Sequence, residues 1–265
     1  LEKYGDATPE ALVESAMTEL KYLEDVDFFN IKISVKHSNV PLMIESYRLL
    51  AEKVEYPLHL GVTEAGPLPG GLIKSTAGIS TLLNEGIGDT IRYSLTADPI
   101  EEAKSGRQLL EYLGLRERNS LDLIACPSCG RAEVDVIKVA EEAQEALNKE
   151  DIPLQVAVMG CVVNGPGEAR SADIGIAAGK NKGHLFIRGE VVRVVNEKDM
   201  VTSLLDEARL IVEEGIESRL AAADDNAAEL AQKDVEDLLN SQGDINNFTE
   251  RKKSVVEITS KQDND

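Results

Sequence analysis

The first half of the chain alternates amphipathic helical segments with short runs in which apolar residues recur at every second position. Residues 31–36 (Ile-Lys-Ile-Ser-Val-Lys) have the alternation of a strand, whereas Leu42, Ile44, Leu49 and Leu50 form one apolar stripe of a helix at about 40–54. The same patterns predict helices at about 9–25, 71–84 and 99–113, and strands at 58–62 and 90–95. Three successive strand-then-helix units are typical of a parallel sheet covered by helices.

From about residue 119 the pattern indicates a second, smaller α/β domain. It predicts strands at 121–125, 154–159, 173–178, 184–187 and 191–195, and helices at about 132–148 and 197–214. Beyond 216 the chain is rich in Ala, Asp, Asn and Gln, and only 221–239 could form a helix. We therefore expect domains at 1–118 and 119–216, followed by an acidic, flexible tail at 217–265.

Polar side chains stand where each of the three strands of the first half gives way to its loop. Lys36 ends the first strand, Thr63 and Glu64 follow the second, and Ser94 follows the third. The carboxyl ends of parallel strands share one rim, where such folds build active sites. Polar residues can also simply mark loop starts, but three together favour a site. Three units cannot close an eight-stranded barrel, so a barrel would need further strands before Leu1.

Charge and composition narrow the classes of function. The 28 Lys and Arg residues against 48 Asp and Glu residues give a net charge of −20, with no evident basic stripe. Such a chain repels phosphate backbones and anionic lipid surfaces, so we expect neither a nucleic-acid nor a membrane partner. Apolar runs such as 156–159 are far shorter than the roughly 20 residues of a membrane span. With no visible leader and only three cysteines, we expect a cytoplasmic protein.

The three cysteines are grouped. Cys126 and Cys129 form a C-x-x-C motif after a predicted strand, and Cys161 follows the next one. A structural zinc site, a redox dithiol and an iron–sulfur cluster all remain open, although a dithiol leaves Cys161 unexplained. A cluster with three cysteines has one iron left for another ligand, and Glu168, beyond a Gly-Pro-Gly turn, is suitably placed. The alternative for Glu168 is an ordinary surface acid.

Four segments resemble one family. Residues 126–131 (CPSCGR) and 159–169 (MGCVVNGPGEA) resemble the cluster domain of the 4-hydroxy-3-methylbut-2-enyl diphosphate synthases, and 58–66 (LHLGVTEAG) and 85–92 (EGIGDTIR) resemble their barrel. The resemblance implies the C-terminal half of a TIM-type (β/α)8 barrel followed by a smaller α/β iron–sulfur domain. It also implies an enzyme that reductively opens 2-C-methyl-D-erythritol 2,4-cyclodiphosphate. The 27 residues between Asp98 and Cys126 leave no room for the extra domain of plant relatives, so the bacterial form is implied.

The resemblance also implies roles for individual residues. A [4Fe-4S] cluster would be held by Cys126, Cys129, Cys161 and Glu168, with Glu168 displaced by substrate. Lys36, Thr63 and Ser94 would hold the diphosphate, which suits an ammonium and two hydroxyl donors. Glu64 would contact the substrate hydroxyls or deliver a proton, with its pKa raised by burial beside the diphosphate. Reduced flavodoxin or ferredoxin would supply electrons, and the enzyme would be a homodimer. The alternative from another class is a zinc-stabilised binding or scaffold protein.

Overall fold

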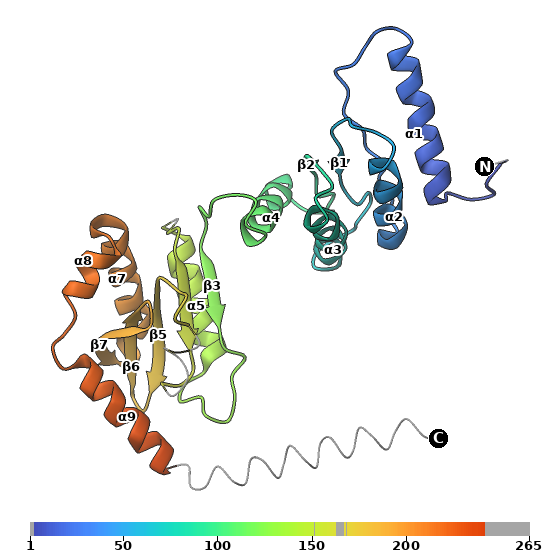
Figure 1. The fold of residues 1–265 in the computed structure, drawn as a ribbon. Coiled ribbons are helices and arrows are strands. Elements are labelled where there is room, and N and C mark those ends of the chain that lie inside the picture. The colour runs from blue at the N-terminus through green and yellow to red at the C-terminus, as the bar shows by residue number, and fades with distance from the viewer. Residues whose placement is uncertain (1–2, 151, 163–166, 168, 242–265) are drawn as a thin grey trace, which may run out of the picture. The chain divides into compact units, whose positions relative to one another are not determined.

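The structure, a computed structural model, describes residues 3–150, 152–162, 167 and 169–241. The chain divides into two compact units, one at Leu1–Arg118 and a second that begins at Asn119 (Figure 1). Among the described residues, no helix is long and apolar enough to cross a membrane.

The first unit contains four helices and two short strands among its described residues. The helices are α1 (Pro9–Glu24), α2 (Val40–Ala51), α3 (Gly70–Asn84) and α4 (Pro99–Tyr112), and the strands are β1 (His59–Leu60) and β2 (Thr90–Ile91). The side chains of Thr8, Asn39 and Asp98 cap α1, α2 and α4, each with a proline in the first turn. The predicted helices are thus confirmed to within a few residues.

The extended segments pair in parallel but make fewer ladder contacts than predicted. β1 pairs with β2, and of the predicted strand at 31–36 only Ile33 forms a bridge, to Leu58. Alternation of apolar residues predicts an extended backbone, not the number of ladder hydrogen bonds. Pro57, which accepts from the Ile33 N–H at 2.9 Å, has no N–H of its own to extend the pairing.

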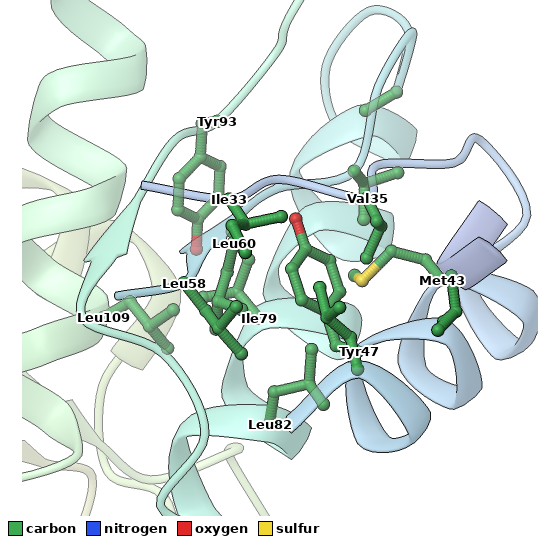
Figure 2. Packing of buried hydrophobic residues seen from close by; sticks show 14 of the residues in the cluster. Ile33, Val35, Met43, Tyr47, Leu58, Leu60, Ile79, Leu82, Tyr93 and Leu109 are labelled. Carbon is green, nitrogen blue, oxygen red and sulfur yellow. The ribbon is translucent and has the colours of Figure 1, made fainter. Parts of the chain in front are cut away.

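One side of these extended segments forms the core of the first unit. Their apolar side chains pack against the helices around the fully buried Tyr47 (Figure 2). The core members labelled in Figure 2 are Ile33, Val35, Met43, Tyr47, Leu58, Leu60, Ile79, Leu82, Tyr93 and Leu109. Because side chains alternate along an extended chain, the residues between them face the opposite side, and these are largely polar.

The second unit is a five-stranded mixed sheet in the order β3-β4-β5-β6-β7. β3 (Asp122–Ala125), β4 (Gln155–Met159) and β5 (Ile174–Gly179) are parallel, and β6 (Lys182–Ile187) and β7 (Glu190–Asn196) continue the sheet antiparallel. The helices α5 (Val136–Asn148) and α7 (Met200–Glu214), the latter preceded by the 3-10 turn η1 (Glu197–Asp199), cover one face, which we call the first face. The opposite, second face has a smaller core of Ala157, Met159, Ala169, Ala172, Ala177 and Phe186.

The C-terminal segment is helical where a flexible tail was predicted from 217, and the helix considered at 221–239 is found at 227–241. The segment forms α8 (Ile216–Ala221) and α9 (Ala227–Ser241), and both pack on the second unit. Ala227 and Ala231 are buried, and the Asp234 carboxylate is bonded to two residues of β6. The composition predicts a solvent-exposed tail, because the segment packs through alanines and an ionic contact instead of large apolar side chains. Residues 242–265 of the predicted tail lie outside the described residues.

Candidate functional site

The predicted rim residues of the first unit lie on neighbouring segments. The Thr63 N–H donates to the carbonyl of His37 at 3.3 Å, and the Ala65 N–H donates to the carbonyl of Ser94 at 3.2 Å. The three loops that carry Lys36, Thr63 and Ser94 are therefore side by side at the carboxyl ends of the parallel segments. All three side chains are partly buried.

A chain of hydrogen bonds orders the polar side of these segments. Lys36 Nζ donates to Ser34 Oγ at 3.0 Å, and Ser34 Oγ donates to the His59 carbonyl at 2.8 Å. The same carbonyl accepts from the Tyr47 hydroxyl at 2.6 Å, while His59 Nδ1 lies 2.8 Å from Thr90 Oγ1. His59 is half-buried, and its ring lies on the polar side of the segments.

Positive charge concentrates on this side despite the acidity of the whole chain. Burial lowers the pKa of Lys36, and the charges of Arg92 and Lys32 lower it further. Burial also lowers the pKa of His59, assisted by Lys32, Lys36 and Arg92. We call Lys32, Lys36 and Arg92, together with the uncharged His59 ring among them, the cationic strand face. They form the kind of local basic patch that the sequence did not reveal, because its members are spread over 60 positions of the chain.

Arg92 is a candidate site residue that the sequence reasoning missed. It lies between Ile91 and Tyr93, which pack against the core, so the alternation alone assigns Arg92 to the opposite side. Its charge acts on both Lys36 and His59. A guanidinium there suits recognition of a phosphate group.

Gly61 keeps the cationic strand face closely packed. A Cβ atom at this position would lie 2.8 Å from the Arg92 carbonyl oxygen and 3.4 Å from Lys36 Cδ. The first distance is shorter than real contacts of a Cβ atom allow. The absence of a side chain at 61 therefore lets the segments that carry Lys36 and Arg92 approach one another.

Glu64 adopts a left-handed backbone conformation, with φ 52°. Residues other than glycine pay for this conformation, and such strain is concentrated at functional sites. The Glu64 side chain itself is exposed.

The cysteines of the second unit stand at the carboxyl ends of two adjacent parallel strands. Cys126 follows β3 and Cys161 follows β4, which pair with Ala125 opposite Val158. Cys126 is partly buried, Cys129 is exposed and Cys161 is buried, and none is in a disulfide. Between the two cysteines of the C-x-x-C motif, Ser128 has a left-handed φ of 58°, as a tight turn requires.

Gly160 joins the two cysteine loops. Its N–H donates to Cys126 Sγ at 3.2 Å, and its carbonyl accepts from the Glu133 N–H at 2.8 Å. A Cβ atom here would lie 2.4 Å from Val136 Cγ2, so only glycine fits. α5 begins at Val136 rather than at the predicted 132, because the Asp135 side chain caps the helix by accepting the Lys138 N–H at 3.2 Å, while the N–H groups of Ala132 and Glu133 donate to Cys129 and Gly160.

The donor set suits a thiophilic metal centre, since thiolates and backbone N–H donors to sulfur are typical of iron–sulfur sites. Within the described ranges, no three His, Cys, Asp or Glu side chains are already grouped closely enough to hold a metal ion. The predicted fourth ligand, Glu168, lies outside the described residues. The fully buried His184 is bonded through Nε2 to Asp234 at 2.7 Å, so it is engaged elsewhere.

Comparison with known proteins identifies the family. Residues 1–107 match the model described as the GcpE TIM-barrel domain, and residues 122–210 match the GcpE protein C-terminal domain. Curated relatives named 4-hydroxy-3-methylbut-2-en-1-yl diphosphate synthase (flavodoxin) include one from Acidothermus cellulolyticus, 58% identical over 86% of this chain and 58% of its own length. Another, from Corynebacterium glutamicum, is 58% identical over 84% of this chain and 59% of its own. The chain thus spans about three fifths of the length of these relatives. With both of its units matched in order, it belongs to the GcpE family, the family of the 4-hydroxy-3-methylbut-2-en-1-yl diphosphate synthases.

Proposed function

We propose that the protein containing this chain reductively opens 2-C-methyl-D-erythritol 2,4-cyclodiphosphate to (E)-4-hydroxy-3-methylbut-2-enyl diphosphate, in the non-mevalonate isoprenoid pathway. The reaction consumes two electrons and two protons and releases one hydroxyl group as water. The observation that carries the proposal is the match of both units to relatives named for this synthase, at 58% identity. Residues 1–118 would be the C-terminal half of a (β/α)8 barrel, and 119–216 the iron–sulfur domain.

The cationic strand face is the proposed binding site for the diphosphate. Lys36 and Arg92 supply positive charge, and the loops of Thr63 and Ser94 bring two hydroxyl donors to the same rim. Lys36 is held by Ser34, so a bound phosphate would find its ammonium already oriented. An arriving dianion would also reverse the electrostatic penalty that the clustered cations impose on one another.

Glu64 is the proposed group for contact with the substrate hydroxyls or for proton delivery. It is exposed in this chain, and closure of the site around substrate would desolvate it. Desolvation favours the protonated carboxyl, which could then give its proton to the departing hydroxyl.

The proposed cofactor is a [4Fe-4S] cluster held by Cys126, Cys129, Cys161 and Glu168. When bound, it would take electrons one at a time and accept the substrate oxygen as a Lewis acid. Gly160 would stabilise the Cys126 thiolate through its N–H, and the buried position of Cys161 would keep water from that side of the site. Reduced flavodoxin, the donor in the relatives' names, or ferredoxin would supply the electrons. A homodimer in the bacterial cytoplasm would complete the site between chains.

Glu168→Gln in the full-length protein tests the proposal, with Glu190→Gln, an exposed carboxylate of β7, as the matched control. We expect Glu168→Gln to lose turnover or cluster integrity, and Glu190→Gln to keep both. A zinc-stabilised binding protein would tolerate both changes. Turnover and iron content unaffected by Glu168→Gln would contradict the assigned ligand.

A further inference from the structure

The C-terminal segment 216–241 wraps around the open edge of the second unit's sheet. α8 contacts α7 and β6 on the first face, where Ile216 and Leu220 join the core. The chain then crosses β7, the last strand of the sheet, where the Asp224 N–H donates to the Val192 carbonyl at 2.9 Å. α9 packs against β7 beyond this crossing (Figure 1). The match to the family's C-terminal model ends at residue 210, before this segment begins.

Among the ion pairs of the segment, two groups involve a buried partner, one on each side of the crossing. On α8, Arg219 binds the buried carboxylate of Glu207 with Nε–Oε1 at 2.7 Å and Nη2–Oε2 at 3.3 Å. On α9, Asp234 accepts from Lys182 Nζ at 2.8 Å through one oxygen and lies 2.7 Å from His184 Nε2 through the other. His184 is fully buried, so Asp234 is the partner of a group that solvent cannot reach.

α9 lies on the second face of the sheet, the face that carries the cysteine loops. Lys182, His184 and Phe186 alternate with Leu185 and Ile187, which belong to the first-face core, so these three point to the second face. Phe186 shares the second-face core with Ala157, Met159 and Ala177, and Cys126 packs against that same core. Contact is thus continuous from α9 through β6 and the middle strands to the first cysteine.

The contacts of Asp234 also lie at the same end of the strands as the cysteines. Lys182 begins β6 opposite Gly179, the last residue of β5, and His184 pairs with Ala177. β5 is parallel to β3 and β4, so its carboxyl end is at the end of the sheet where Cys126 and Cys161 stand. Asp234 consequently fastens α9 at the end of the sheet that carries the cysteines.

We propose that residues 216–241 form a strap that holds the second face of the sheet in place beneath the cysteine loops, and that Asp234 is its latch. The strap covers the edge strand β7 and fixes β6 against the small residues at the centre of the sheet. The support of the cysteine loops by the strap rests on the proposed iron–sulfur function. The role of Asp234 in holding α9 on the sheet does not depend on that function.

Asp234→Ala in the full chain tests the latch, with Glu229→Ala as the control. Both change one carboxylate of α9, but Glu229 is exposed. The first readout is amide hydrogen exchange without the cluster, followed by mass spectrometry. We expect roughly ten- to hundredfold faster exchange in 227–237 and in β6 for Asp234→Ala, the effect of losing a charged hydrogen bond. Glu229→Ala should exchange like the wild type. Wild-type exchange in Asp234→Ala would overturn the latch.

Asp234→Asn provides a milder variant in case Asp234→Ala does not fold. It keeps an acceptor for His184 but removes the charge that Lys182 neutralises, so intermediate exchange is expected. Exchange equal to that of the wild type would again contradict the latch.

The second readout is the rate at which a chelator removes iron from the anaerobically reconstituted protein. Asp234→Ala should lose iron severalfold faster than the wild type and Glu229→Ala. If Asp234→Ala loosens α9 but loses iron at the wild-type rate, the strap does not support the cysteine loops. A wild-type protein that takes up no iron would refute the proposed function, and the exchange comparison would still decide the latch.

Discussion

Replacing Gly61 by alanine should disrupt the packing of the cationic strand face. The new Cβ atom would lie 2.8 Å from the Arg92 carbonyl oxygen, a contact that backbone must relieve, and 3.4 Å from Lys36 Cδ. Overpacking of this kind costs about 1–3 kcal/mol. Since the relief requires the segment of Arg92 to move, binding of inorganic diphosphate should weaken as well.

Gly106→Ala is the matched control for this substitution. Gly106 lies inside α4, and its new Cβ atom would meet Ile91 Cδ1 and Tyr93 Cδ2 at 3.6 Å, which is ordinary contact. Alanine is favoured over glycine in a helix interior by about 1 kcal/mol. Both substitutions restrict the unfolded chain in the same way. The free energies of unfolding of the two variants should therefore differ by about 2–4 kcal/mol.

Tyrosine fluorescence during urea unfolding measures this difference in the first unit alone. The chain has no tryptophan, and its six tyrosines all lie between residues 4 and 112. The midpoint should fall for Gly61→Ala and stay level or rise for Gly106→Ala. A Gly61→Ala variant as stable as Gly106→Ala, with unchanged affinity for diphosphate, would refute the close approach of the two segments.

Three other expectations follow from single contacts. Burial and cationic neighbours lower the pKa of Lys36 below the ordinary 10.5, so Lys36 loses its charge as the pH rises toward that value. The affinity for diphosphate, measured by calorimetric titration, should fall over the same pH range. Lys36→Arg should remove this dependence of affinity on pH. Tyr47→Phe removes the hydrogen bond to the His59 carbonyl and should cost about 1 kcal/mol in urea unfolding, whereas no cost would contradict the buried bond. Arg219→Ala removes the bidentate partner of the buried Glu207 carboxylate, which keeps Arg193 at 3.4 Å, and should destabilise the second unit by about 2 kcal/mol in thermal unfolding followed by circular dichroism; wild-type stability would contradict that pairing.

The periodic parts of the sequence were sufficient to predict most elements. Apolar periodicity located α1, α2 and α4 to within a few residues, and alternation located the five strands described in the second unit. These periodicities are local, because they reflect which side chains share one face within a single helix or strand.

Features that depend on distant partners were not predictable in the same way. Arg92 joins Lys36 only because two parallel segments place them on one side of the sheet, and neither residue is unusual in its own neighbourhood. Likewise, the Asp234 carboxylate looks like one more charge in an acidic tail until β6 supplies Lys182 and His184. Pairing across 50 residues leaves no periodic trace in a single sequence.

The metal content of the anaerobically purified protein decides whether its cysteines hold an iron–sulfur cluster. Iron, sulfide and zinc would be quantified per chain beside a visible absorption spectrum. We expect about four irons and four sulfides per chain with a coloured cluster, as a cubane bound by Cys126, Cys129, Cys161 and Glu168 requires. One zinc ion per chain and no colour would contradict it.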